Sequence, residues 1–172
     1  MTNLLTEHIS VAGSRLVNNN PNPGCPDAMP SPEDGRRSPI LFVCIENSSR
    51  SVMAEAFAKN LGLEASSAGT FPSTHVNPLV LSAMGEVGID VSRNIPKELT
   101  PEMIESAGLV VLTDSTLEKS LPGNLRKKMR KKLVEWSIPD PQGKSIEEIR
   151  YIRDMIERMV EALAKESSPR TR

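Results

Sequence analysis

Two residues that can do chemistry together, Cys44 and Arg50, stand six positions apart in one short segment. A thiolate is a strong nucleophile, and a guanidinium offers two parallel N–H donors that match two oxygens of a phosphoryl group. Cys-x5-Arg is therefore the minimum set of groups for phosphoryl transfer through a thiol. Because such a pair arises by chance in roughly one chain in ten of this size, its interpretation depends on the elements around it.

The segments on either side of the pair predict an anion site. The apolar run at residues 40–43 is typical of a buried strand. A helical stripe that ends at Gly62 follows the loop, and it is made of Met53, Ala56, Phe57 and Leu61. Where a strand leads through a short loop to a helix N-terminus, the loop amides point inward and the helix dipole adds positive potential. With Cys44 at the mouth of the loop, we expect six residues to bind the oxyanion: Ile45, Glu46, Asn47, Ser48, Ser49 and Arg50.

The remainder of the chain predicts three further buried strands that alternate with helices. The strands are expected at residues 63–67, 109–112 and 133–138. Helix starts are indicated by Asn77-Pro78, by Thr100-Pro101 and by a capping box of Ser145 and Glu148. The last helix has an inward stripe made of Ile149, Ile152, Ile156, Met159 or Val160, and Leu163. The pattern predicts an α/β, three-layer sandwich with a doubly wound, four-stranded parallel sheet and the phosphate loop at the end of its first strand.

Three polar residues follow strands of this predicted sheet. Functional crevices of such sheets lie at the carboxyl ends of the strands. Cys44 follows the first strand, Asp114 the third and Asp140 the fourth, so we expect them at one edge. Asp140 is suited to protonate a leaving group and then to activate water as a base, whereas Asp114 is as suited to bracing a loop as to contacting water. Ser51 can donate a hydrogen bond to the thiolate.

Several motifs occur in the order found in one known family: Val43-Cys44-x-x-Asn47-x-x-Arg50-Ser51-x-Met53-Ala54-Glu55-Ala56, Ser67-Ala68-Gly69-Thr70, Gly88-Ile89-Asp90 and Asp140-Pro141. Over about residues 39–165 the chain resembles the low-molecular-weight protein tyrosine phosphatases and their relatives, the thioredoxin-coupled arsenate reductases. The resemblance implies a cysteinyl-phosphate mechanism, for which we expect no metal and no organic cofactor. It implies that Cys44 is the nucleophile, Arg50 the phosphate clamp and Asp140 the general acid. Three supporting residues are then expected: Asn47, Ser51 and Ser67.

Departures from the family pattern leave alternatives open. The resemblance favours a phosphatase that acts on phosphotyrosine, or a related phosphomonoester, in a protein or a small aryl phosphate. The reductases use two further cysteines, but this sequence has none after Cys44. An arsenate reductase that borrows an external thiol or Cys25 is therefore the first alternative. The second is an inactive phosphate-binding or phosphoprotein-binding relic, because Glu46 replaces the usual glycine and would repel an anion unless it points to solvent. Ser48 occupies a position where residue size can select the phospho-amino acid, so phosphoarginine also stays open.

Composition gives no reason to expect a nucleic acid or a membrane as partner. The 172 residues include 21 basic and 22 acidic ones, a net charge of −1. The chain lacks both an apolar segment of membrane-spanning length and a secretory signal pattern, and we expect a reducing cytoplasm. Turn-forming residues at 1–38 predict a disordered extension, followed by one domain at 39–166 and a tail at 167–172.

Overall fold

The structure, a computed structural model, describes residues 38–166. It contains a four-stranded parallel sheet in the order β2-β1-β3-β4. The strands are β1 (Ile40–Cys44), β2 (Ala65–Gly69), β3 (Leu109–Leu112) and β4 (Leu133–Glu135). The predicted extension, apart from Ser38, lies outside the described residues, and so do the predicted tail and Cys25.

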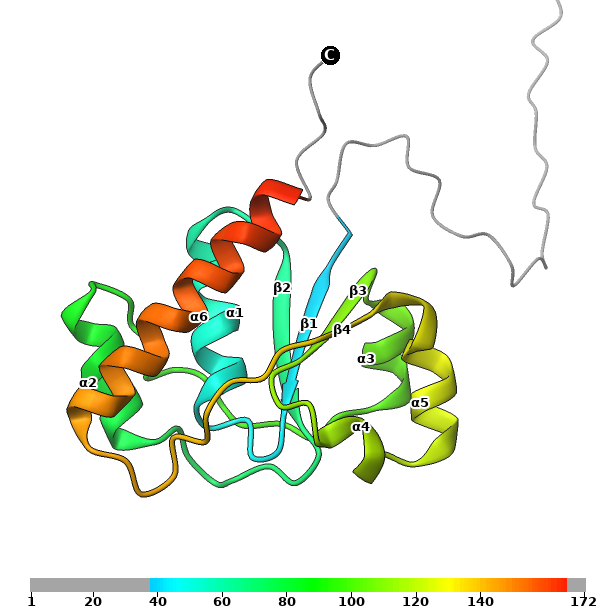
Figure 1. Ribbon diagram of the computed structural model, residues 1–172, viewed down its shortest axis with the longest axis horizontal. Coiled ribbons are helices and arrows are strands. Elements are labelled where there is room, and N and C mark those ends of the chain that lie inside the picture. The colour runs from blue at the N-terminus through cyan, green and yellow to red at the C-terminus, as the bar shows by residue number, and fades with distance from the viewer. Residues whose placement is uncertain (1–37, 167–172) are drawn as a thin grey trace, which may run out of the picture. The chain divides into compact units, whose positions relative to one another are not determined.

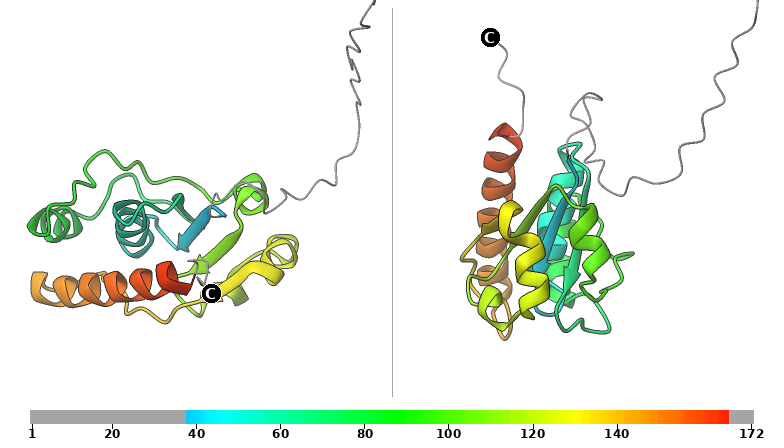
Figure 2. Two further views of the ribbon diagram at one scale, coloured as in Figure 1. Left: turned by 90° about the horizontal axis from the view of Figure 1, so that it is seen from above. Right: turned by 90° about the vertical axis from the view of Figure 1, so that its right-hand side faces the viewer.

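Helices cover both faces of the sheet, so the predicted three-layer α/β architecture is confirmed (Figures 1 and 2). One face packs against α1 (Arg50–Asn60), α2 (Pro78–Glu86) and α6 (Ile146–Glu166). The other face packs against α3 (Pro101–Ser106), α4 (Leu117–Ser120) and α5 (Gly123–Met129), and a 3₁₀ turn at Arg130–Lys132 follows α5. Neither α4 nor α5 has a counterpart among the helix starts indicated by the sequence.

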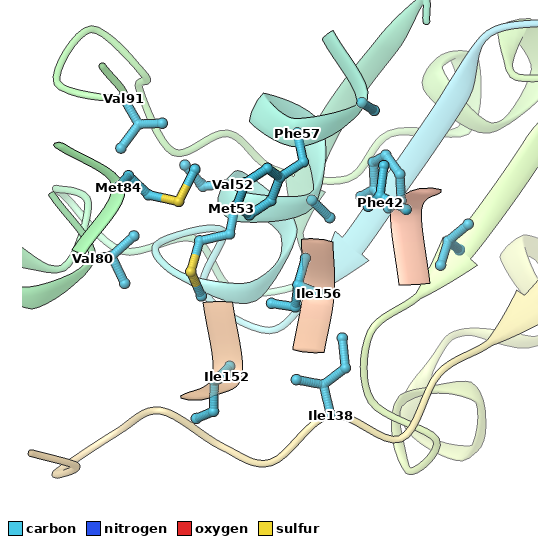
Figure 3. Packing of buried hydrophobic residues seen from close by; sticks show 14 of the residues in the cluster. Phe42, Val52, Met53, Phe57, Val80, Met84, Val91, Ile138, Ile152 and Ile156 are labelled. Atoms are coloured by element: carbon cyan, nitrogen blue, oxygen red, sulfur yellow. The ribbon is translucent and has the colours of Figure 1, made fainter. Parts of the chain in front are cut away.

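The side chains of β1 alternate between two hydrophobic clusters. Phe42 packs on the side of α1, α2 and α6, where its ring lies 5.7 Å from that of Trp136. Figure 3 shows this cluster, with Met53 of α1 and Ile156 of α6 among its members. Leu41 belongs to the cluster on the opposite side. Because both faces of the sheet are buried, β1 is a continuous apolar run rather than an alternating one.

The predicted helix signals are confirmed by the geometry. Ser145 and Glu148 exchange hydrogen bonds between side chain and backbone amide, at 3.3 and 2.9 Å. The side chains of Asn77 and Thr100 accept hydrogen bonds from amides at the starts of α2 and α3. Gly62 follows α1 with a φ of +74°, a left-handed conformation that suits glycine.

Three of the four strands differ from their predicted bounds: β1 extends one residue further, to Cys44, β2 is shifted to residues 65–69, and β4 is shorter. β2 begins at Ala65 rather than at residue 63, because the amide of Leu63 still bonds to the carbonyl of Ala58 in α1. β4 ends at Glu135, but the chain continues beside β3: the amide of Trp136 donates to the carbonyl of Leu112 at 2.7 Å. The predicted order of elements is unaffected.

The predicted apolar stripe of α1 is only partly correct. Phe57 is buried, whereas Leu61 is 43% exposed. Besides its apolar residues, α1 buries three polar side chains: Arg50, Ser51 and Glu55. A buried polar group needs a hydrogen-bonding partner, and these three find theirs around the loop that follows β1.

Candidate active site

A hollow of about 120 Å³ lies at the carboxyl end of β1. Its lining consists of Cys44, Ile45, Glu46, Ser48, Ser49, Arg50, Asn77, Asp140, Pro141 and Gln142. The three residues expected to be catalytic therefore line one hollow, although Asp140 is distant in sequence from the other two. Parallel strands bring them together, because the loops that follow β1 and β4 leave the sheet at the same edge.

The carbonyl groups of the loop after β1 point toward the segment that follows β2. Those of Cys44, Ile45, Glu46 and Ser48 accept hydrogen bonds of 2.8 to 3.1 Å from amides within residues 70–77. Across a planar trans peptide, the C=O of one residue and the N–H of the next point in opposite directions. The amides that follow these carbonyls therefore point away from that segment, and the amide of Asn47 donates to Sγ of Cys44. Backbone amides at such a turn between a strand and a helix are donors that can bind an oxyanion.

Gly69 lets this loop lie directly against the end of β2. It pairs with Cys44 in the sheet register. A Cβ atom on Gly69 would stand 2.5 Å from the carbonyl oxygen of Ile45 and 2.9 Å from the amide nitrogen of Asn47. Both atoms belong to the backbone of the loop, so a larger residue would displace the loop itself. No pattern in the sequence indicates this close approach.

The sulfur of Cys44 is buried at the bottom of the loop, with two polar partners. The backbone amide of Asn47 donates to Sγ at 3.1 Å, and Oγ of Ser51 lies 2.9 Å from Sγ. Hydrogen-bond donors at sulfur stabilise its negatively charged form. Asn47 has a φ of +50°, a left-handed conformation that asparagine tolerates better than most residues.

The side chain of Asn47 joins the loop to two neighbouring elements. Its Nδ2 donates to Oγ of Ser51 at 2.9 Å and to Oγ of Ser67 at 2.8 Å. Its Oδ1 accepts a hydrogen bond from the backbone amide of Lys97 at 3.0 Å. The three residues expected to support the loop, Asn47, Ser51 and Ser67, are thus in one buried network.

Arg50 is held by an acidic partner behind the hollow. Its Nη1 donates to Oδ2 of Asp114 and to the carbonyl of Ile138, both at 3.1 Å. Its Nε and Nη2 make no hydrogen bond to another residue in the described part of the chain, so they remain for a ligand in the hollow that Arg50 lines. Of the two uses left open for Asp114, the structure supports bracing.

The charge of Asp114 suits this bracing role. Partial burial disfavours the carboxylate, but hydrogen bonds from Thr116 and the guanidinium of Arg50 outweigh burial, and the pKa of Asp114 lies below its usual value. At neutral pH the carboxylate therefore stays ionised opposite Arg50. The ion pair fixes where the guanidinium lies before any ligand arrives.

The rim of the hollow is exposed and carries two carboxylates. Asp140 accepts a hydrogen bond of 3.0 Å from the amide of Gln142 in a tight turn. Glu46 accepts one of 3.0 Å from the hydroxyl of Ser48. The Ser48 side chain is therefore directed to Glu46. Asn77, which the sequence indicated only as a helix cap, also lines the hollow, and its amide donates to the carbonyl of Ser48.

Within residues 38–166 no group of three or more His, Cys, Asp or Glu side chains is arranged to hold a metal ion. The helices of that same region include none that is long and apolar enough to cross a membrane.

Comparisons with known proteins relate both the sequence and the fold to phosphatases and arsenate reductases. The family described as low molecular weight phosphotyrosine protein phosphatase matches residues 39–169. An arsenate reductase of Staphylococcus aureus (strain Newman) is 37% identical over 129 residues, which cover 71% of this chain and 92% of the relative.

Solved structures agree with this relationship. The YwlE arginine phosphatase from Geobacillus stearothermophilus has a TM-score of 0.69 at 28% identity, and the match covers 75% of this chain and 92% of that one. The tyrosine phosphatase Wzb from Escherichia coli K30 has a TM-score of 0.70 at 17% identity, covering 76% of this chain and 99% of that one, which shows the fold alone. The resemblance predicted from the sequence motifs is confirmed.

Proposed function

The chain belongs to the low molecular weight phosphotyrosine protein phosphatase family, and we propose that it is a cysteine-dependent phosphatase that hydrolyses phosphotyrosine or a related phosphomonoester. The observation that carries the proposal is the shared hollow. Cys44, Arg50 and Asp140 line it together, and the sulfur of Cys44 lies among hydrogen-bond donors. These are a nucleophile, an oxyanion clamp and a proton donor, the three roles that the reaction needs.

In the first step, Sγ of Cys44 attacks phosphorus in line with the leaving oxygen. The S–P bond forms while the P–O bond to the leaving group breaks. The loop amides and Arg50 bind the three equatorial oxygens, over which the charge is spread in the transition state. Asp140 gives its proton to the leaving oxygen, so that the group departs as an alcohol or phenol.

In the second step, water attacks the cysteinyl-phosphate. Asp140, now ionised, accepts a proton from the water molecule. The P–O bond to water forms as the S–P bond breaks, which releases inorganic phosphate and restores the Cys44 thiolate. Neither step uses a metal or an organic cofactor.

Arsenate reduction is the second candidate, favoured by the sequence relative from Staphylococcus aureus. Arsenate has the shape and charge of phosphate, so the same loop fits it. Reduction, however, needs a thiol to attack the Cys44 adduct, and Cys44 is the sole cysteine in the described part of the chain. The second thiol would come from an external reductant or from Cys25.

A substrate panel with a nucleophile variant tests both candidates in the full-length chain. The wild type should hydrolyse p-nitrophenyl phosphate, and Cys44→Ser should lower kcat at least about a thousandfold, because the nucleophile is lost. Equal rates in the two proteins would refute the phosphatase proposal. Phosphate binding without turnover in the wild type would instead support a binding relic.

The same panel compares phosphotyrosine, phosphoserine and phosphoarginine peptides, and arsenate with a thiol reductant. Phosphotyrosine should give the highest kcat/KM. Phosphoarginine is included because a fold neighbour is an arginine phosphatase. Consumption of reductant that depends on arsenate and is lost in Cys25→Ala would favour the internal reductase, whereas consumption that survives Cys25→Ala would favour an external thiol.

A further inference from the structure

A buried carboxylate, Glu55, lies at the far end of the hydrogen-bond network that begins at Cys44. Glu55 is on α1 and only 3% exposed. Its Oε1 accepts from Nζ of Lys59 at 2.5 Å, and its Oε2 accepts from the hydroxyl of Ser67. Lys59 itself is mostly exposed. Burial of a carboxylate costs free energy unless its partners are well placed. An exposed lysine on the same helix does not explain why Glu55 is buried and in contact with Ser67.

One backbone amide determines which atom is the donor in each hydrogen bond between Glu55 and Cys44. The N–H of Lys97 can only donate, so the atom of Asn47 that faces it, 3.0 Å away, is the oxygen Oδ1. Nδ2 of Asn47 therefore faces the two serines, and its two N–H groups donate to Ser51 and Ser67. Both serine oxygens act as acceptors toward Asn47, and each must direct its own proton elsewhere.

The two serine protons then have defined destinations. The proton of Ser67 goes to Glu55, whose carboxylate can only accept. The proton of Ser51 goes to Sγ of Cys44, 2.9 Å away. The contact between Ser51 and Cys44, which by distance alone leaves either atom as donor, is thereby assigned: Ser51 donates and sulfur accepts. With Ser51 and the Asn47 amide both donating to it, the sulfur has two donors placed to stabilise a thiolate, the form that attacks phosphorus.

We propose that Glu55 is a positioning residue for the nucleophile, a role that rests on the proposed phosphatase function. By accepting the Ser67 proton, Glu55 holds Ser67 as an acceptor for Asn47. Asn47 in turn keeps both its left-handed backbone, with φ of +50°, and its donation to Ser51. Without the carboxylate, the Ser67 hydroxyl proton is buried without an acceptor, and the site relieves this by turning Ser67 or Asn47 away. Ser51 then loses the contact that directs its proton to Cys44.

The test measures the nucleophile directly, in the full chain with Cys25→Ser so that Cys44 is the remaining thiol. Glu55→Leu keeps a similar volume but removes both acceptor oxygens, so that Ser67 is left without its acceptor. Alkylation of Cys44 by iodoacetamide, followed across pH, should shift to higher pH and slow about tenfold at pH 6, because a hydrogen bond to a charged group is lost. With p-nitrophenyl phosphate, kcat should fall about tenfold, while KM changes less than about twofold.

A double-mutant cycle separates this role from a general loss of stability. Because Glu55 acts through Ser51, Glu55→Leu should change alkylation less than about twofold when Ser51→Ala is already present. The matched control is Glu86→Leu, which removes a carboxylate that pairs with Arg150 and Arg153 away from the hollow. That variant should lower the Tm without moving the alkylation profile.

Three results would overturn the role of Glu55: an unchanged alkylation profile in Glu55→Leu, full additivity with Ser51→Ala, or an equal shift in Glu86→Leu. The alkylation measurement needs no substrate. If the wild type hydrolyses none of the phosphoesters, the phosphatase proposal fails, and the alkylation profile still decides whether Glu55 positions Cys44.

Discussion

The two sides of the hollow are built in opposite ways. On the nucleophile side, Cys44, Asn47 and Ser51 are almost completely buried and joined by short hydrogen bonds to α1, β2 and the backbone at Lys97. On the acid side, Asp140 is exposed and is held by one hydrogen bond, from the amide of Gln142. Several elements of the fold hold the residues of the nucleophile side, whereas a single hydrogen bond holds Asp140 on the acid side.

This difference matches the two demands of the proposed phosphoryl transfer. The phosphoryl group is the same in every substrate, so its cradle gains from being rigid before binding. Leaving groups differ in size and in their need for a proton, and they meet the exposed rim formed by residues such as Asp140 and Glu46. We therefore expect changes on the buried side to affect all substrates equally and changes at the rim to depend on the leaving group.

Among Gly69→Ala, Asp140→Asn and Glu46→Gly, we expect Gly69→Ala, on the buried side, to lower kcat/KM most. The added Cβ would stand 2.5 Å from the carbonyl oxygen of Ile45, so the loop must move away from β2. Because a shift of about an ångström can cost about a hundredfold in rate, kcat/KM should fall at least that far, equally for p-nitrophenyl phosphate and phenyl phosphate.

The control for this change is Gly85→Ala in α2. A Cβ on Gly85 meets no atom within 4 Å, and alanine favours helices. Gly85→Ala should keep full activity and melt at the same or a higher temperature. Wild-type activity in Gly69→Ala would show that the loop is not fixed by its approach to β2, and the contrast between the two sides would fail.

A smaller effect that depends on the leaving group is expected from Asp140→Asn. Asparagine preserves the turn to Gln142 but cannot supply the proton. Phenolate needs that proton more than nitrophenolate does, so kcat should fall about a hundredfold for phenyl phosphate and about tenfold for p-nitrophenyl phosphate. Asp90→Asn removes a carboxylate from an equivalent turn, to the amide of Ser92, and should leave both rates unchanged. Equal losses for the two substrates would argue against a proton-donor role.

The smallest effect is expected from Glu46→Gly at the rim. Removal of one exposed negative charge should lower the KM of a dianionic aryl phosphate about two- to threefold, because exposed charges interact weakly. The change should shrink as salt is raised, since salt screens exposed charges. Glu64→Gln, an exposed carboxylate at the opposite end of β2, should leave KM unchanged. A large rise in kcat in Glu46→Gly would instead support the inactive relic as the natural state.

Much of the fold could be predicted because its signals are local. The apolar run of β1, the caps at Asn77 and Thr100 and the capping box before α6 each act within a few residues of themselves. The boundary of β2 could not be predicted in this way. Leu63 is apolar and buried like a strand residue, but its amide is bonded to α1, a competition that the sequence pattern does not show.

The polar residues of α1 were less predictable than its apolar ones. Phe57 fits the helical stripe, but burial of Glu55 contradicts the usual exposure of carboxylates. Its partner Ser67 lies on β2, so no spacing within the helix indicates the contact. The same holds for Asp114, which the sequence placed near the site and the structure placed opposite Arg50.

The sequence by itself determined the strand-loop-helix unit that carries Cys44 and Arg50, and the order of the strands and helices around it. These follow from residue types, short spacings and the right-handed connection of parallel strands. Only the tertiary structure decided which atoms donate to the sulfur of Cys44, why Gly69 must lack a side chain and how Glu55 comes to lie beneath the loop. The reason is that hydrogen-bond direction and close backbone approach depend on groups far apart in the chain, and the packing of β2 against β1 and α1 brings them within reach.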